Sequence, residues 1–249
     1  MRIKKEKKPM TPFRAFMDKL VFSLYVVALV LACCFSCFIW FQKTYFDSFW
    51  VNGQSMWPTL NVEARDSNGD LFNETKKSMI NATGVDFIIA DSHQNVLSKL
   101  ERFDIVVCKY ADDDYFDKIK RIAVLPGETF YFDAPGIGEE GNGTLHILNK
   151  ATKKFEVIKQ PVDNKYIVLG DYSNYADPEE PTTLKKDEYF VMGDNRAYSS
   201  DSRDKRNGPI TKNNIEAKAI ALVARCKTAI NSEGKLVPTN INYFWPRYF

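Results

Sequence analysis

Histidine is scarce in this sequence, because His93 and His146 are the only two histidines among 249 residues. Neither lies in an H-E-x-x-H motif, which excludes zinc-dependent hydrolysis of that type. A Ser-His-Asp triad needs a histidine as its base, and nothing in the sequence around either residue marks it for that role. We therefore expect no metal site and no cofactor, and any hydrolytic reaction must use another base.

Cysteine is also sparse outside one apolar segment. Cys33, Cys34 and Cys37 lie within that segment, which leaves only Cys108 and Cys226 in the rest of the chain. The C-x-x-C pattern at 34–37 has no βαβ context, so it does not indicate a redox motif. Both remaining cysteines occur in strand-like runs, and we expect two buried thiols rather than a disulfide.

The sequence lacks a strong excess of charge of either sign. Its 34 Lys and Arg residues against 32 Asp and Glu residues leave a net charge of +2, so no nucleic-acid partner is expected. Seven basic residues are instead gathered near the start of the chain: Arg2, Lys4, Lys5, Lys7, Lys8, Arg14 and Lys19.

Only one long hydrophobic run is present, at residues 20–40, and it contains no charged residue. About 20 apolar residues suffice for a helix to cross the ~30 Å hydrocarbon core of a bilayer. Basic flanks remain in the cytoplasm, and the run is longer than the core of a cleaved signal peptide. We predict a cytoplasmic segment at 1–19, a single uncleaved transmembrane helix at 20–40 and an extracytoplasmic domain at 41–249 of a cytoplasmic-membrane protein.

The extracytoplasmic part is predicted to be mostly β. Runs rich in β-branched and aromatic residues occur at 103–110, 119–125, 129–132, 188–192 and 218–223, with turn residues between them. No long helical periodicity follows residue 40, which indicates an antiparallel sheet architecture. The polar stretch at about 63–100 is interpreted as an insert outside the core.

A serine and a lysine are candidates for nucleophilic catalysis without histidine. Ser55 lies 15 residues after the predicted span (55 − 40), and lysine serves as the base in known Ser-Lys enzymes. Such a lysine must be neutral, which burial promotes by lowering its pKa. Lys120 shares one face of an apolar strand with Ile122, although a surface lysine with a buried stem would show the same pattern.

A polar loop at 193–203 contains groups that could brace such a site. Asp201 and Arg203 could form an ion pair, and Ser199 could orient a neutral lysine amine. The S-x-x-K string at 202–205 also resembles that of penicillin-binding enzymes. However, the S-D-N and K-T-G elements of those enzymes are absent from the sequence.

Taken in order, these segments resemble bacterial type I signal peptidases, which are membrane-bound Ser-Lys endopeptidases. The matching motifs are Ser-Met-x-Pro-Thr-Leu at 55–60, Asp-Ile-Val-Val at 104–107, Lys-Arg at 120–121 with Leu-Pro-Gly at 125–127, Gly-Asp-Asn-Arg at 193–196 and Ser-x-Asp-Ser-Arg at 199–203. The resemblance implies a coiled antiparallel β-sheet domain on the single N-terminal helix. It also implies an enzyme that removes signal peptides from exported preproteins, with the phospholipid bilayer and the secretion translocon as further partners.

The resemblance also implies roles for individual residues. Ser55 corresponds to the nucleophile and Lys120 to the general base, while Ser199 corresponds to the hydroxyl that orients the lysine. Asp201 and Arg203 correspond to a structural ion pair, and the walls of the pockets for small substrate side chains correspond to Phe49, Val51, Met56 and Ile119.

Four residues depart from the family pattern. Gly53 occupies a position where some members have a serine that completes the oxyanion hole. Ala197 and Tyr198 replace an Asp-Asn pair, and Lys118 replaces a tyrosine. Two alternatives stay open: a specialised relative with a narrow substrate set, and an anchored β-rich binding module without activity.

Overall fold

The computed structural model describes residues 11–72, 78–110, 113–133, 144–162, 175, 178–204 and 206–249. The chain divides into two compact units, Met1–Tyr45 and Phe46–Phe249. Of the predicted cytoplasmic segment 1–19, residues 1–10 lie outside the described residues.

The first unit contains one helix, α1 (Pro12–Tyr45), which extends beyond both ends of the predicted span. Pro12 stands at its first position, where the missing N–H costs nothing. Arg14, Asp18 and Lys19 continue the helix because no glycine or proline interrupts it. Within the described residues this is the one helix long and apolar enough to cross a membrane.

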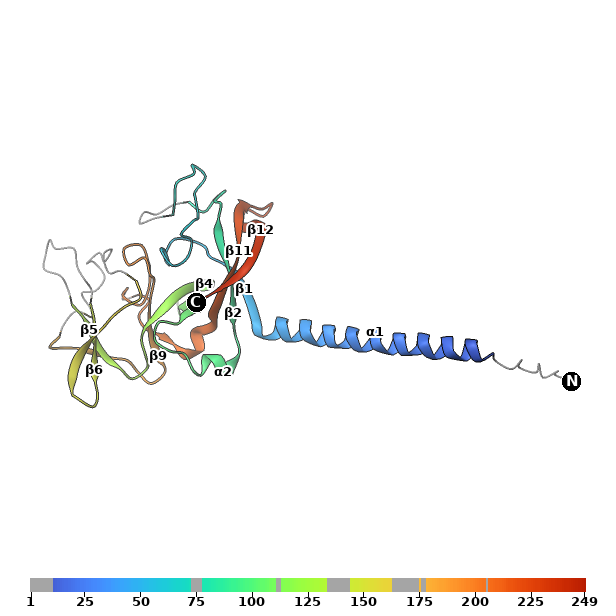
Figure 1. The fold of residues 1–249 in the computed structure, drawn as a ribbon. Coiled ribbons are helices and arrows are strands. Elements are labelled where there is room, and N and C mark those ends of the chain that lie inside the picture. Colours follow the sequence, from blue (N-terminus) through green and yellow to red (C-terminus); the bar gives the residue numbers. More distant parts are fainter. Residues whose placement is uncertain are drawn as a thin grey trace. The chain divides into compact units, whose positions relative to one another are not determined.

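The second unit consists of two antiparallel sheets, as the predicted mostly-β class requires (Figure 1). The larger sheet has the order β1 (Phe46–Trp50), β2 (Val85–Asp91), β11 (Ile215–Ile230), β3 (Ile105–Tyr110), β4 (Asp113–Val124), β9 (Glu188–Met192) and β10 (Ile210–Thr211), with β12 (Leu236–Tyr248) paired to β11. The smaller sheet has the order β7 (Lys154–Ile158), β6 (Leu145–Asn149), β5 (Thr129–Phe132) and β8 (Thr182–Thr183). Two short helices, α2 (Gln94–Leu97) and η3 (Lys212–Asn214), complete the described elements.

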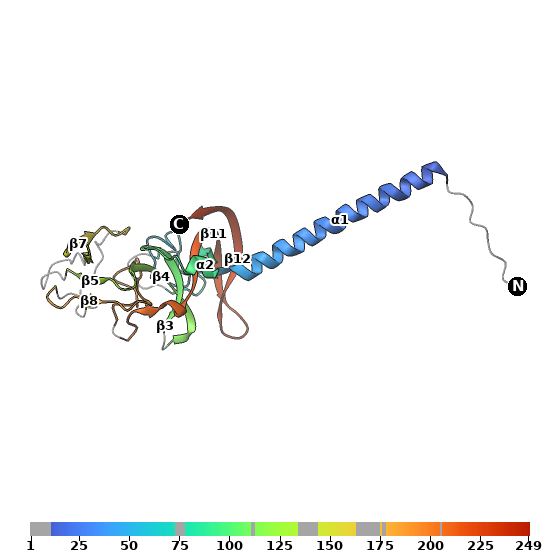
Figure 2. The same cartoon turned by 90° about the horizontal axis from the view of Figure 1, so that it is seen from below.

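The smaller sheet lies at one end of this unit and the β11–β12 hairpin at the other, with β4 and β9 between them (Figures 1 and 2). A cluster of buried side chains that includes Phe130, Phe132 and Phe190 joins β5 to β9. A second cluster lies under β3, β4 and β9 and includes Val106, Ile122 and Val191. The last residues of β4 therefore belong to both clusters, Ile122 to one and Ala123 and Val124 to the other.

The interpretation of 63–100 as an insert outside the core is wrong for part of that stretch. Strand β2 pairs antiparallel with both β1 and β11, and its Ile88 and Ala90 are fully buried. Phe72 is also fully buried, in a cluster that contains Cys226 of β11. The run at 85–91 is short and β-branched, but the many polar residues around it dominate the composition of the wider stretch.

Strand β11 is much longer than the predicted strand at 218–223, because it contacts three partners in succession. It pairs with β3, with β2 and with β12, and register irregularities interrupt each ladder. Such bulges let one long strand bend as it passes from one antiparallel neighbour to the next. Cys108 and Cys226 are buried free thiols, which confirms that expectation.

Candidate active site

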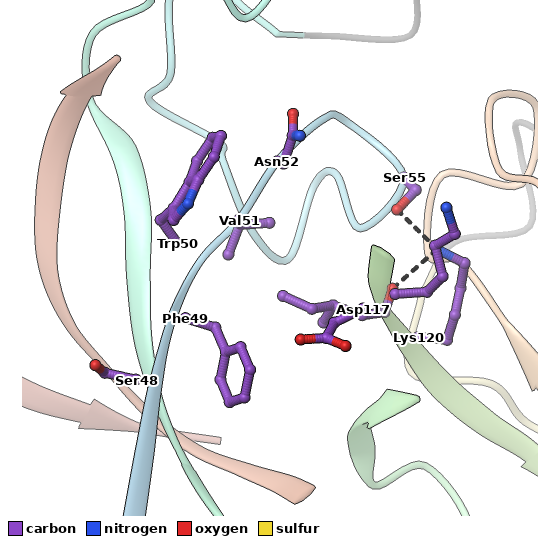
Figure 3. Close-up of a pocket in the computed structure, with 10 residues that line it drawn as sticks. Ser48, Phe49, Trp50, Val51, Asn52, Ser55, Asp117 and Lys120 are labelled. Carbon is purple, nitrogen blue, oxygen red and sulfur yellow. Dashed lines mark hydrogen bonds between the residues drawn. The ribbon is translucent and has the colours of Figure 1, made fainter. Parts of the chain in front are cut away.

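The nucleophile candidate and the base candidate meet in the structure. The Nζ of Lys120 donates a hydrogen bond of 3.0 Å to the Oγ of Ser55, although the two residues are 65 positions apart (Figure 3). A second bond of 3.0 Å runs from the same Nζ to the carbonyl of Ile119. Ser55 lies in the turn that follows β1, and Lys120 lies on β4. This separation is within the range in which a base can take a proton from a nucleophile.

The amine of Lys120 is removed from water, since the residue is only 3% exposed. Burial lowers the pKa of this amine from its ordinary value, and the positive charges of Lys118 and Arg203 act in the same direction. The carboxylate of Asp201 opposes the shift but does not reverse it. A lysine with a lowered pKa can hold a free lone pair and act as a base.

Asp201 and Arg203 form the buried ion pair that was expected from the sequence. Arg203 binds Asp201 through two bonds, Nε to Oδ1 at 2.7 Å and a terminal guanidinium nitrogen to Oδ2 at 2.8 Å. The same carboxylate accepts the N–H of Gly193 at 2.9 Å. Burial raises the pKa of the Asp201 carboxyl, but Arg203 and the Gly193 N–H together hold it below its ordinary value. The pair therefore remains charged and holds both ends of the loop together.

Ser199 does not contact Lys120 in the way the resemblance implies. Among the described residues, the Nζ of Lys120 donates to Ser55 and Ile119, and no hydrogen bond joins it to the Oγ of Ser199. The hydroxyl of Ser199 is buried beside Asp201 and helps to lower the pKa of that carboxyl. Its role in orienting the lysine stays a prediction.

The same loop also holds the segment that carries the nucleophile. Asn195 donates its backbone N–H to the carbonyl of Ser55 at 3.0 Å and its side-chain amide to the carbonyl of Gln54 at 3.2 Å. The neighbouring Asp194 forms a two-bond ion pair with Arg121, at 2.8 and 2.7 Å. The Gly-Asp-Asn motif thus ties the turn of Ser55 to β4. The sequence contained both partners of the Asp194–Arg121 pair, but nothing in it indicated their contact.

A cavity of about 560 Å³ opens beside Ser55 and Lys120. Three of the four predicted wall residues line it, namely Phe49, Val51 and Ile119. Met56 is not among the lining residues, because it is buried in the cluster beneath them. Further lining residues, which the sequence did not reveal, are Ser48, Trp50, Asn52 and Asp117 (Figure 3). Lys118 also lies on this wall.

Within the described ranges, the wall formed by β4 is a strand edge that no other strand pairs with. On one side, β3 pairs with residues 118–121 of β4, whereas on the other side β9 pairs only from Arg121 onward. The N–H and C=O of Ile122 both bond toward β3, at Asp104 and Phe103. Because backbone groups alternate in direction along a strand, those of Ile119 and Asp117 must face the cavity. An extended chain could pair with this edge.

Comparison with known proteins identifies the family. A family model described as "Signal peptidase, peptidase S26" matches residues 22–224. The chain is 32% identical over 128 residues to signal peptidase I V of Bacillus subtilis (strain 168), which covers 51% of this chain and 69% of that protein. It is 30% identical over 166 residues to signal peptidase I of Bacillus amyloliquefaciens (64% of each chain). It is also 28% identical over 197 residues to signal peptidase I of Pseudomonas aeruginosa PAO1 (71% of this chain, 64% of that protein).

The family model spans most of the chain, including most of the apolar helix, the turn that carries Ser55 and the strand that carries Lys120. Two of these three relatives are matched over slightly less than two thirds of their own length. The chain belongs to the signal peptidase family, peptidase S26.

Proposed function

We propose that this protein is a membrane-anchored serine endopeptidase that removes signal peptides from exported preproteins, with Ser55 as nucleophile and Lys120 as general base. The observation that carries the proposal is the 3.0 Å hydrogen bond between the buried amine of Lys120 and the hydroxyl of Ser55. Membership in the signal peptidase family supports the same reaction and the same class of substrate.

The reaction would proceed through an acyl-enzyme. The Oγ of Ser55 attacks the carbonyl carbon of the scissile peptide while neutral Lys120 takes the hydroxyl proton. Collapse of the tetrahedral intermediate breaks the C–N bond, and the Lys120 ammonium returns the proton to the leaving amine. Lys120 then takes a proton from water, and the resulting hydroxide attacks the ester carbonyl. When this second tetrahedral intermediate collapses, the C–O bond to Ser55 breaks, the Lys120 ammonium returns the proton to the Ser55 Oγ, and the signal peptide leaves with a free carboxylate.

Backbone pairing would position the substrate. The edge of β4 at Ile119 and Asp117 offers N–H and C=O groups to an extended peptide, which is the mode called β-strand addition. The Ile119 carbonyl already accepts one bond from Lys120 and has a second lone pair for the peptide. Main-chain pairing recognises any extended sequence, and side-chain pockets then provide the specificity. The apolar wall of Phe49, Val51 and Ile119 suits small apolar side chains of the substrate.

The apolar helix α1 supports action at a membrane. Its length and composition suit a bilayer span, and the basic residues at the start of the chain favour a cytoplasmic N-terminus. The catalytic unit would then lie on the extracytoplasmic side, with lipids and the translocon as its neighbours. A signal peptide is itself an apolar membrane segment, so anchoring raises the local concentration of enzyme near its substrate.

The test is cleavage of a purified preprotein in detergent, with the cleavage site mapped. We expect Ser55→Ala, Lys120→Ala and Lys120→Arg all to abolish cleavage, the last because a guanidinium stays protonated. Lys186→Ala, at an exposed lysine outside the cavity, serves as the matched control and should cleave normally. Full activity of any of the three site variants would refute the mechanism, and activity in a chelator should be undiminished.

The charged residues on the cavity wall favour a second candidate, a relative with a narrow substrate set. Asp117 and Lys118 place charges of opposite sign beside the apolar wall, which would select among substrates. A panel of unrelated preproteins distinguishes the two candidates: general cleavage supports the broad enzyme, and cleavage of one class supports the specialised one. Acylation of Ser55 by a serine-reactive probe would exclude the non-catalytic binding module.

A further inference from the structure

Asn61 lies beneath the segment that carries Ser55 and is completely buried. Its side-chain amide nitrogen donates two hydrogen bonds, to the carbonyl of Val51 at 2.8 Å and to the carbonyl of Gly53 at 2.7 Å. These carbonyls belong to the stretch that leads from β1 to Ser55. One side chain therefore holds this stretch at two points.

Asn61 is itself held by Asp86 of β2 through a reciprocal pair of bonds. The backbone N–H of Asn61 donates to the Asp86 carboxylate at 2.6 Å, and the backbone N–H of Asp86 donates to the side-chain oxygen of Asn61 at 2.8 Å. Arg225 of β11 binds the other carboxylate oxygen of Asp86 at 3.0 Å. Both amide hydrogens and the amide oxygen of Asn61 are thus in use, so its rotamer is determined by the central strands of the sheet.

Packing alone does not hold the chain at Gly53. This glycine has φ of +103°, and no atom beyond its two chain neighbours lies within 4 Å of the place where its β-carbon would be. Glycine also offers the least intrinsic resistance to a change of backbone angles. The hydrogen bond from Asn61 is what sets the plane of the peptide between Gly53 and Gln54.

Three consecutive carbonyls are held in this way. Asn61 binds that of Gly53, while Asn195 binds those of Gln54 and Ser55. In the described part of the chain, the N–H groups of Gln54 and Ser55 have no acceptor. Since each held carbonyl also determines the direction of the N–H in its peptide plane, these two donors have set directions. Of these two residues, Ser55 lines the cavity, and a donor fixed before the reaction is what stabilises a developing oxyanion.

We propose that Asn61 is a positioning residue for the nucleophile, which sets the place of Ser55 by binding the Val51 and Gly53 carbonyls. This inference rests on the proposed function, in which Ser55 attacks a peptide carbonyl. Asp86 of the sheet holds Asn61, and Asn61 holds the backbone at Gly53. The sheet would thus order the backbone at the position where some members of the family have a serine.

Asparagine suits this position for two reasons. Its backbone has φ of +60°, a left-handed conformation that asparagine tolerates better than most residues. Its amide also provides two donors on one nitrogen for two carbonyls, whereas aspartate would face both carbonyls with acceptor oxygens. Leucine would leave the two carbonyls without this partner.

Two variants separate positioning from folding. Asn61→Gly keeps the backbone angle and removes the side chain, and Asn61→Asp keeps the shape and removes the donors. Thr228→Val is the matched control, because Thr228 is a buried residue of β11 that accepts the N–H of Ala82 at 3.0 Å, away from the cavity. All three are made in the full chain in detergent, together with Ser55→Ala.

The readouts are the melting temperature and, with a signal-sequence peptide, kcat and KM at a temperature where every variant is folded. We expect both Asn61 variants to lose about 10²-fold in kcat with KM within about threefold, because misplacing a reacting group by ~1 Å costs this much. Thr228→Val should lower the melting temperature and keep kcat. If the Asn61 variants keep kcat within threefold, or lose no more of it than Thr228→Val does, the positioning role is overturned.

The same experiment separates this inference from the function on which it rests. If the wild-type protein cleaves the peptide and Ser55→Ala does not, the proposed function stands whatever the Asn61 variants do. If Ser55→Ala cleaves like the wild type, or the wild type does not cleave, the proposed function fails and the role of Asn61 falls with it.

Discussion

Gly193 lies directly against Ser199 and leaves no room for a side chain. A β-carbon on Gly193 would lie 2.2 Å from the Oγ of Ser199 and 2.4 Å from the carbonyl oxygen of Ser55. Real β-carbons essentially never approach other atoms below 3.0 Å. The absence of a side chain at one residue of the loop is therefore what lets Ser199 and the turn of Ser55 sit side by side.

Gly193→Ala should displace Ser199 or Ser55, and we expect a loss of about 10²-fold in kcat. Gly234→Ala is the control, since its positive φ makes the substitution strained but its surroundings are open and it lies in the turn between β11 and β12. The measurement is kcat for a signal-sequence peptide alongside the melting temperature. A wild-type kcat for Gly193→Ala would show that the loop can move to accommodate the β-carbon without displacing Ser55 from Lys120.

The pH dependence of activity should report the protonation of Lys120. Only the neutral amine can act as base, so kcat/KM should rise as the pH rises through the lowered pKa of Lys120. Removing the like charge of Lys118 with Lys118→Gln should raise the pKa of Lys120 and move this acidic limb to higher pH. Lys235→Gln, in an exposed turn, should leave the limb in place. An unmoved limb in Lys118→Gln would argue that another group titrates.

Arg203→Met should destabilise the folded protein by about 3–5 kcal/mol, because it leaves the buried Asp201 carboxylate without its partner. Urea unfolding at neutral pH measures the loss. Asp201 has a folded-state pKa below 3.8, so its stabilisation of the wild type is present above pH 3.8 and is lost as the pH falls through that lower pKa. Arg206→Met breaks an exposed ion pair and should cost little. Equal stabilities of the two variants would contradict a structural role for the Asp201–Arg203 pair.

Backbone pairing with β4 predicts an alternating pattern in modified substrates. Peptides N-methylated at single residues should bind about 5-fold more weakly, or worse, wherever the lost N–H would meet Ile119 or Asp117. Methylation at the residues between these should have little effect, because their N–H groups point away from the edge. KM values across a series of singly methylated peptides test this. A uniform effect along the peptide would exclude pairing with the edge of β4.

Much of the fold and of the catalytic pair could be predicted from the sequence. The strands at 129–132 and 188–192 were predicted with the bounds they have in the structure, since β-branched runs between turn residues are a local signal. Ser55 and Lys120 could be named because one follows an apolar span and the other interrupts an apolar strand face. Both signals can be recognised from the residues immediately around them in the sequence.

Other parts were out of reach because they depend on contacts distant in sequence. Strand β2 was not predicted because the residues around it in the sequence are mostly polar. It belongs to the core because it pairs with β11. Asn61 looks like an ordinary turn residue until β2 brings Asp86 against it. Met56 was expected on the cavity wall, yet the turn of Ser55 directs it into the core.

The sequence by itself determined which chemistry is available to this protein: an apolar span, a serine without a histidine partner, and a lysine in an apolar strand. These depend on the kinds of residue present and on local periodicity. The tertiary structure alone decided that Lys120 is buried beside Ser55, that one edge of β4 stays open and that Asn61 and Asn195 hold the turn of the nucleophile. Each of these is a contact between segments tens of residues apart, and burial and hydrogen-bond geometry exist only once the sheet has formed.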